Sequence, residues 1–163
     1  MANVDRPIGF RPRVPLRCTP YKTGSAGAAI YINDLMKEDT NGVVLPAAVA
    51  NNIWGSSADY NAASTTLASL GVFDDPQQEF IAQDDASATL GQVGLGTNYD
   101  ITVTTGNTTT LISTQEIAAS IPSADSGNVR LIRLLNTPGN ALGDNADWIC
   151  MINEHAYKAT AGI

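Results

Sequence analysis

The sequence predicts an all-β protein, a β-sandwich or β-barrel, on three observations. Short runs rich in β-branched residues recur along the chain, such as ITVT at 101–104 and TTTLIST at 108–114. Gly, Asn, Asp and Pro stand between these runs, as turn residues do. No segment carries a long apolar stripe with the 3.6-residue period of a helix. Many short strands at this spacing are typical of sandwiches and barrels.

We predict nine strands in order along the chain. They are the runs 29–36, 42–45, 52–55, 78–83, 91–95, 99–104, 109–115, 128–135 and 147–153. The segment 60–70 is the one candidate for a short helix, although its Ser and Thr side chains compete for backbone hydrogen bonds. The last two runs, VRLIRLL and DWICMIN, flank a turn-rich loop and predict a β-hairpin with a long tip.

The final run is apolar on both of its alternating faces. Trp148, Cys150 and Ile152 fall on one face, and Ile149 and Met151 fall on the other. Such a strand either lies between two packed layers or forms part of a subunit interface. We take Trp148, Ile149 and Met151 as the candidate oligomer interface.

Residues 1–20 hold four of the eight prolines. Proline fixes φ and removes a hydrogen-bond donor, so this stretch is neither a helix nor a central strand. We predict an extended N-terminal arm over 1–20, followed by a single β-rich domain over 21–163. Because Ile8 and Phe10 share one face of an extended chain, the arm is expected to lie against a surface.

The formal net charge of −7 is divided unevenly. Residues 1–22 carry five basic and one acidic side chain, a net of +4, and the other 141 residues carry a net of −11. A chain this acidic is not a general nucleic-acid binder, which needs a basic footprint. Its apolar content argues against disorder, and no apolar run reaches the length of a membrane span.

The arginines of the arm allow three interpretations: contact with nucleic-acid phosphates, ion pairs with carboxylates of a protein partner, or a solvated tail. The acidic body opposes the first. We favour the protein partner because the apolar and proline residues between the arginines suit docking on a protein surface. The candidate docking residues are Arg6, Ile8, Phe10, Arg11, Arg13 and Arg17.

The inventory of reactive side chains is poor, so we predict no enzyme. The one histidine, His155, lacks the partners of a catalytic triad. The adjacent carboxylate, Glu154, would point to the opposite side of a strand and could not orient the histidine ring. One histidine and two distant cysteines, Cys18 and Cys150, give no zinc pair. The glycines of GQVGLG at 91–96 precede a strand and not the helix that a phosphate loop requires. We expect no metal and no cofactor.

The carboxylate pairs at 74–75 and 84–85 and the loop at 144–147 are interpreted as turn residues, with a calcium loop as the open alternative. The N-terminus has no apolar stretch of a secretory signal, so both thiols are expected to be reduced and a Cys18–Cys150 bridge is the less favoured alternative. We interpret Cys150 as a small core residue.

Several short motifs resemble the small structural proteins encoded in the head-gene clusters of tailed bacteriophages, the best understood of which are capsid decoration, or cement, proteins. The motifs are Met1-Ala2-Asn3 followed by Pro7-x-Gly9-Phe10-x-Pro12, then Asp74-Asp75-Pro76 before Phe80-Ile81-Ala82-Gln83, then Leu135-Asn136-Thr137-Pro138-Gly139-Asn140, and finally Ile152-Asn153-Glu154-His155-Ala156-Tyr157.

This resemblance implies a β-rich body that assembles as a homotrimer on the outer capsid surface of the virion, after synthesis in the host cytoplasm. The arm then contacts the major capsid protein, and no nucleic acid or membrane is bound directly. The alternative is a host- or glycan-binding β-module of the virion or tail, displayed on the Asn-, Thr- and Gly-rich loops.

Overall fold

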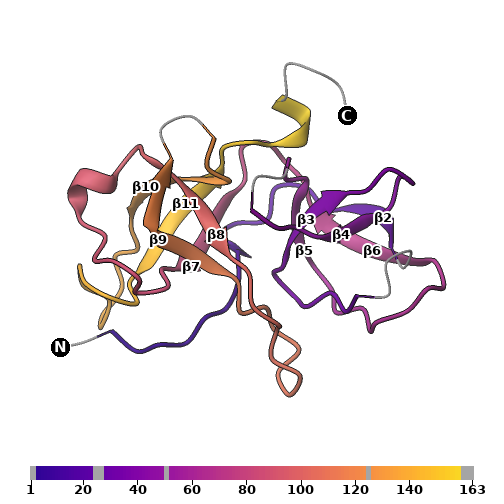
Figure 1. Cartoon of the computed structure of the whole chain (residues 1–163), viewed down its shortest axis with the longest axis horizontal. Helices are drawn as coiled ribbons and strands as arrows, with labels where there is room; N and C mark the ends of the chain where they lie inside the picture. Colours follow the sequence, from indigo (N-terminus) through magenta and orange to yellow (C-terminus); the bar gives the residue numbers. More distant parts are fainter. Residues whose placement is uncertain (1–2, 24–27, 50–51, 124–125, 159–163) are drawn as a thin grey trace.

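The computed structural model describes residues 3–23, 28–49, 52–123 and 126–158, and its regular structure is almost entirely β (Figure 1). It contains two antiparallel sheets. One sheet has the strand order β1 (Arg11–Pro12), β7 (Glu79–Gln83), β11 (Asp147–Ile152), β10 (Val129–Leu134), β8 (Asn98–Thr102) and β9 (Glu116–Ser123). The other has the order β2 (Thr19–Thr23), β6 (Ala68–Phe73), β5 (Gly55–Ser57), β3 (Leu35–Glu38) and β4 (Val44–Pro46). The all-β prediction is confirmed.

Two short 3₁₀ turns are the helical elements within the described ranges, η1 (Gln92–Gly94) and η2 (Ala156–Lys158). Neither approaches the length or apolarity that a helix needs to cross a membrane. The strand predicted at 91–95 is therefore wrong, because Gly94 N–H bonds back to the Gly91 carbonyl at 2.9 Å and tightens the chain into η1. The segment 60–70 does not form the short helix for which it was a candidate. Its last residues, 68–70, belong to strand β6.

The predicted C-terminal hairpin is confirmed. β10 and β11 pair antiparallel, with Val129 opposite Ile152 and Leu134 opposite Trp148. A register shift between Leu131 and Arg133 marks a β-bulge, which increases the local twist of the pair. β7 pairs with the other edge of β11, so the strand that is apolar on both faces lies in the middle of the six-stranded sheet.

Strands β1, β2, β6 and β9 were not predicted, and the predicted strand at 109–115 is a loop. The run 109–115 turns instead, because the Asn107 side-chain oxygen accepts the backbone N–H groups of Thr109 and Thr110 and Leu111 has a φ of 60°. Strand β9 follows it. Its sequence, EIAASIPS, is rich in Ala and Ser, which have little β propensity, so pairing with β8 and not local preference makes it a strand.

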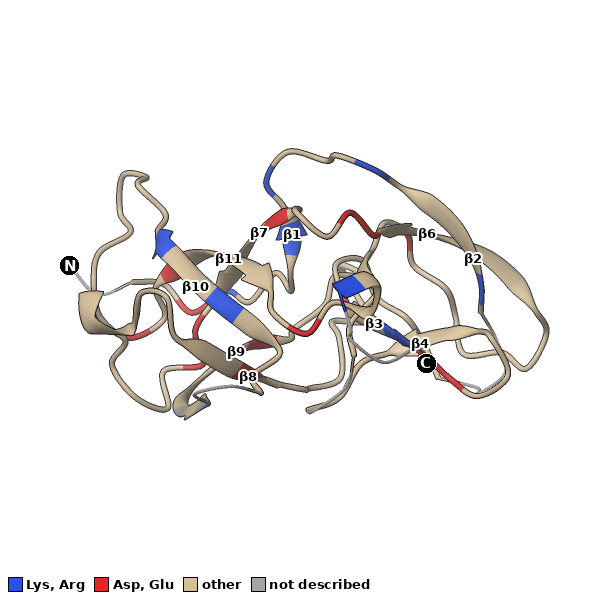
Figure 2. Ribbon diagram, turned by 90° about the horizontal axis from the view of Figure 1, so that it is seen from above, with Lys and Arg blue, Asp and Glu red and all other residues tan. Residues whose placement is uncertain are grey.

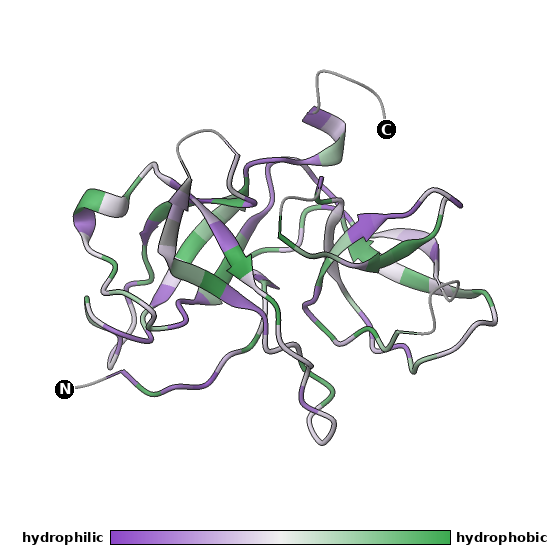
Figure 3. Cartoon of the chain, viewed as in Figure 1, coloured by the Kyte–Doolittle hydropathy of each residue, from purple (hydrophilic) through white to green (hydrophobic). Residues whose placement is uncertain are grey.

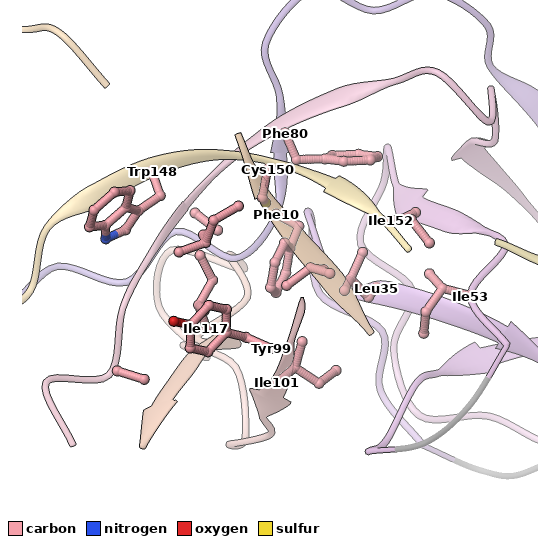
Figure 4. Packing of buried hydrophobic residues seen from close by; sticks show 14 of the residues in the cluster. Phe10, Leu35, Ile53, Phe80, Tyr99, Ile101, Ile117, Trp148, Cys150 and Ile152 are labelled. Carbon is pink, nitrogen blue, oxygen red and sulfur yellow. The ribbon is translucent and has the colours of Figure 1, made fainter. Parts of the chain in front are cut away.

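The main hydrophobic core lies inside the curved six-stranded sheet and reaches the second sheet. Figure 4 shows Phe10, Phe80 and Trp148 in this cluster, and all three are fully buried. Leu35 of β3 joins them, so one core connects both sheets. Each such side chain contributes roughly 1.5–3 kcal/mol by leaving water. Hydrophobic residues lie on strands of both sheets (Figure 3).

The N-terminal segment belongs to this body, and a separate arm is not seen. β1 pairs with β7, and β2 pairs with β6 over all five of its residues. Phe10 is 0% exposed and belongs to the main core. Gly9, with a φ of 65°, turns the chain so that the Phe10 N–H reaches the Asn33 carbonyl at 2.9 Å. The predicted boundary after residue 20 falls within β2.

Three of the four sheet edges are short or carry proline. β1 has two residues including Pro12, β2 contains Pro20, and β4 has three residues and ends at Pro46. Proline lacks the N–H that a further strand would bind.

The fourth edge, on β9, is occupied by the loop after β7. Asp85 accepts the Ala119 N–H at 3.0 Å, and Ser87 accepts the Ser120 N–H at 3.0 Å. An isolated bridge joins Asp84 to Ile117, so the sheet curls toward closure.

Candidate docking surface

The outer face of the six-stranded sheet follows from strand alternation. Phe80 of β7 and Trp148 and Cys150 of β11 belong to the core, so their neighbours Ile81 and Ile149 face the other side. Both isoleucines are buried, at 7% and 0% exposed. They therefore form an apolar centre on this outer face that is packed and not open to water.

Arginines stand at both ends of this apolar centre. Arg11 of β1 is opposite Ile81, Ile81 is opposite Ile149, and Ile149 is opposite Arg133 of β10. The next row contains Arg130 opposite Met151. Figure 2 shows basic positions of β1 and β10 in blue. Within the described residues neither Arg11 nor Arg133 forms an ion pair.

The N-terminal segment crosses the same face toward its far end. The Arg6 N–H donates to the Gln83 side-chain oxygen at 2.8 Å, and the Gln83 amide donates to the Val4 carbonyl at 2.9 Å. The Arg6 guanidinium, 71% exposed, lies 3.8 Å from the Asp147 carboxylate. The backbone of this segment is thus fixed while the Arg6 side chain remains in solvent.

Two adjacent cavities of about 230 and 260 Å³ lie between this segment and the loop before β11. They share Arg6, Pro138 and Asp147, and together we call them the groove. Ile8, Arg11 and Leu135 complete the wall of the second cavity.

The three candidate residues Arg6, Ile8 and Arg11 therefore come together in the groove, while the other three docking candidates have internal partners. Phe10 fills the core and offers no surface to a partner, so its assignment as a docking residue is corrected. Arg13 pairs with Glu79 at 2.6 Å, and Arg17 pairs with Asp74 at 2.7 Å.

Asp74 is the centre of a polar cluster that ties the N-terminal segment to the end of the chain. It is 1% exposed and accepts hydrogen bonds from Arg17 at 2.7 Å, Thr19 at 3.0 Å and Tyr21 at 2.7 Å. Burial disfavours the carboxylate, yet Arg17 and the two hydroxyls outweigh this and hold the pKa of Asp74 below its ordinary value.

Aromatic rings surround this cluster. The Trp54 ring meets the edges of Tyr21 and Tyr157 at centroid distances of 5.4 and 4.9 Å. The two tyrosine hydroxyls are 2.6 Å apart, and the Arg17 guanidinium lies 5.3 Å from the centre of the Tyr157 ring. Because these polar and aromatic groups bind one another, we assign the cluster a structural role.

The single histidine also has a structural setting. His155 is 1% exposed, and its Nδ1 accepts the Tyr157 N–H at 3.1 Å. Burial lowers the pKa of His155 to about 4, so the ring is neutral near pH 7. A ring enclosed in this way and bonded to the following turn is positioned as a core residue and not as a base facing a substrate.

The predicted oligomer-interface residues differ in accessibility. Trp148 and Ile149 are both 0% exposed within the chain itself, so they have no surface to offer. Met151 is half-buried and lines a cavity of about 170 Å³ with Arg130 and Lys158. Of the three, Met151 alone has an accessible side chain on the outer face, where it joins the arginines of β10.

Asp75, Asp84 and Asp85 bond the backbone of their own turns, as the sequence predicted, whereas Asp74 binds the polar cluster. Asp75 accepts the Gln77 N–H at 2.8 Å, and Asp85 accepts the Ser87 N–H at 3.1 Å. Asp84 is fully buried and binds the Trp148 indole N–H at 2.9 Å. No group of three or more His, Cys, Asp or Glu side chains that could hold a metal occurs among the described residues.

Cys18 is exposed and Cys150 is buried, and both are free thiols. Burial raises the pKa of the Cys150 thiol well above its ordinary value, because the thiolate is poorly solvated in the core. This is the environment expected of a small core residue.

Sequence reasoning did not assign Arg130, Arg133 and Lys158 to a site. The available signal was the pair of arginines inside VRLIRLL, which interrupts an otherwise apolar strand. We define the docking surface as the outer face formed by Arg6, Ile8, Arg11, Arg130, Arg133, Met151 and Lys158. Comparisons with protein-family models, curated proteins and solved structures yielded no match for this chain.

Proposed function

We propose that the chain is a structural protein of a tailed-bacteriophage virion, a decoration protein that binds the outer capsid surface and stabilises the lattice of the major capsid protein. The observation that carries the proposal is the docking surface: strand register places Arg11, Arg130 and Arg133 on the same face of the six-stranded sheet, in a chain that is acidic overall. The resemblance of several short sequence motifs to those of head structural proteins supports it, and so does the absence of a catalytic constellation around His155 within the described ranges.

The chemistry of this face suits a protein partner with carboxylates. Arginine presents a planar fork that binds a carboxylate through two hydrogen bonds, and its weak hydration lowers the cost of burial at an interface. Met151 adds an adaptable apolar contact between the charged groups. The acidic remainder of the molecule is then left facing solvent, where its charge keeps neighbouring particles apart.

Self-association would multiply this contact. In a homotrimer, three docking surfaces attach together, and the second and third contacts form at a high effective concentration. Three weak ionic contacts then give firm attachment. A trimer that bridges neighbouring capsid subunits would resist the outward pressure of packaged DNA without forming any covalent bond.

The test is co-sedimentation of the purified protein with empty, expanded phage capsids. We expect the wild-type chain to bind and R11E/R133E, which reverses the charge at both ends of the apolar centre, to lose at least about ten-fold in affinity. The control K22E/K37E makes the same change in charge on the five-stranded sheet and should bind like wild type. Failure of the wild-type chain to bind capsids overturns the proposal.

The same assay separates the alternative function, a host- or glycan-binding module. Bacterial envelopes replace capsids in a parallel set of tubes. Binding to envelopes without binding to capsids would support the module, whereas binding to capsids alone supports decoration. Light scattering of the free protein then tests the trimer.

A further inference from the structure

The groove combines positive charge with apolar surface. It places two arginines, Arg6 and Arg11, against an apolar wall formed by Ile8, Leu135 and Pro138. The Arg6 guanidinium is 71% exposed, so most of its five donors are free even though Asp147 lies 3.8 Å away. Arg11 is also exposed and has no ion pair in the described part of the chain.

The walls of the groove are already fixed. The Asn3 amide donates to the carbonyls of Ala141 and Asp144, both at 2.9 Å. On the facing loop, the Asn140 amide donates to the carbonyls of Leu135 and Asp147 at 2.7 and 2.8 Å. A ligand that enters such a groove does not have to order it, so the free energy lost to ordering on binding is small.

We infer that the groove binds a short acidic peptide segment of the docking partner, with side-chain carboxylates on Arg6 and Arg11. The aliphatic parts of the same segment lie on Ile8, Leu135 and Pro138. This inference rests on the proposed function, because it names the chemistry by which the partner is recognised. Charge complementarity selects the occupant: two exposed guanidinium groups fit two carboxylates bidentately.

A nucleic-acid strand fits the groove less well. The Asp147 carboxylate lies in its floor, with a side chain only 13% exposed, and would repel a phosphate that approached the apolar wall. Two arginines also neutralise too few phosphates for firm binding at physiological salt. A peptide can place its carboxylates on the two arginines and keep neutral backbone over Asp147.

The first experiment titrates the ¹⁵N-labelled chain with an octaglutamate peptide at low salt. We expect the backbone amide signals of the non-proline residues in 6–11 and 135–140 to shift, and the shifts to decrease as salt is added. R6E/R11E should weaken binding by at least about ten-fold. The matched control K22E/K37E reverses two basic residues of the five-stranded sheet, outside the groove and the docking surface, and should stay within about two-fold.

Two outcomes of this titration would overturn the inference: octaglutamate shifts no groove signal, or a thymidine octanucleotide shifts the same signals at lower concentration. Circular dichroism of each variant checks that it folds, which we expect because both groove arginines are exposed.

A second experiment separates the inference from the proposed function. R6E/R11E is tested for co-sedimentation with empty capsids beside the wild-type chain. If wild type binds and R6E/R11E binds equally well, the acidic-segment inference is wrong while decoration stands. If wild type does not bind capsids, decoration is wrong, and the peptide titration still decides whether the groove takes an acidic segment.

Discussion

Burial acts on two carboxylates of this chain with opposite results because their neighbours differ. Burial disfavours the charged form of both Asp74 and Glu116. Arg17 and two hydroxyls compensate Asp74, so its pKa is lowered. Glu116 faces further carboxylates, those of Asp5, Asp85 and Asp84, and its pKa rises to about 7. A residue's partners and not its burial alone decide its charge.

Glu116 should make stability depend on pH near neutrality. Its pKa of about 7 in the folded chain exceeds the ordinary value of 4.5, so its contribution is complete below pH 4.5 and is lost as pH rises through 7. E116Q removes the charge, and we expect it to be more stable than wild type by about 1–2 kcal/mol at pH 8, after allowance for solvent screening, and equal at pH 4. Urea unfolding at both pH values measures this, with E38Q as control. Equal stability of E116Q and wild type at pH 8 would contradict it.

Asp74 should be far more important for stability than the adjacent Asp75. D74N leaves Arg17 without its carboxylate and disturbs the bonds of Tyr21 and Thr19, and we expect a loss of about 2 kcal/mol because Arg17 is partly exposed. D75N changes an exposed turn and should cost less than about 1 kcal/mol. Thermal unfolding compares the two variants, and similar losses would show that the cluster is not a stabilising unit.

At the scale of the element, the N-terminal segment is held by one aromatic anchor. Phe10 is 0% exposed, whereas Leu16, further along the same segment, is 56% exposed. We expect F10A to lose about 3–5 kcal/mol of stability and L16A less than about 0.5 kcal/mol. Urea unfolding of both variants tests whether the segment is part of the folded body. A small loss in F10A would mean that the segment only rests on the sheet.

The strands that the sequence predicted well are those whose own residues specify them. β7, β8, β10 and β11 are rich in branched and aromatic residues and lie close to the predicted runs. β9 was missed because its Ala and Ser residues become a strand through pairing with β8. The run 109–115 has strong β propensity, but the side chain of Asn107 caps it into a turn. Long-range pairing and local capping thus outweighed propensity.

Of the proposed docking surface, the sequence pointed to some residues and not to others. Charge and polarity along the chain singled out Arg6, Ile8 and Arg11, which do lie together. Sequence alone could not show that Phe10 turns inward, because that depends on the left-handed conformation at Gly9. Nor could the sequence place Arg133 of β10 in one sheet with these residues, because that placement depends on the strand order β1–β7–β11–β10.

At the scale of the whole molecule, the shared core should make the two sheets unfold together. Leu35 and Ile53 pack in the same cluster as Phe80 and Cys150. In a C18S background, Cys150 is the only thiol and is fully buried. We expect its alkylation to begin at the same urea concentration at which the far-ultraviolet circular dichroism is lost. Alkylation at lower urea would show that the six-stranded sheet opens independently.

The protected sheet edges have a consequence for the proposed role as a decoration protein. Molecules crowded side by side on one surface meet one another at millimolar local concentrations, where open strand edges would join into fibres. Here Pro12, Pro20 and Pro46 interrupt three edges, and the loop of Asp85 and Ser87 occupies the fourth. Under the proposed function, neighbouring copies would therefore pack through their side chains and not through their strand edges.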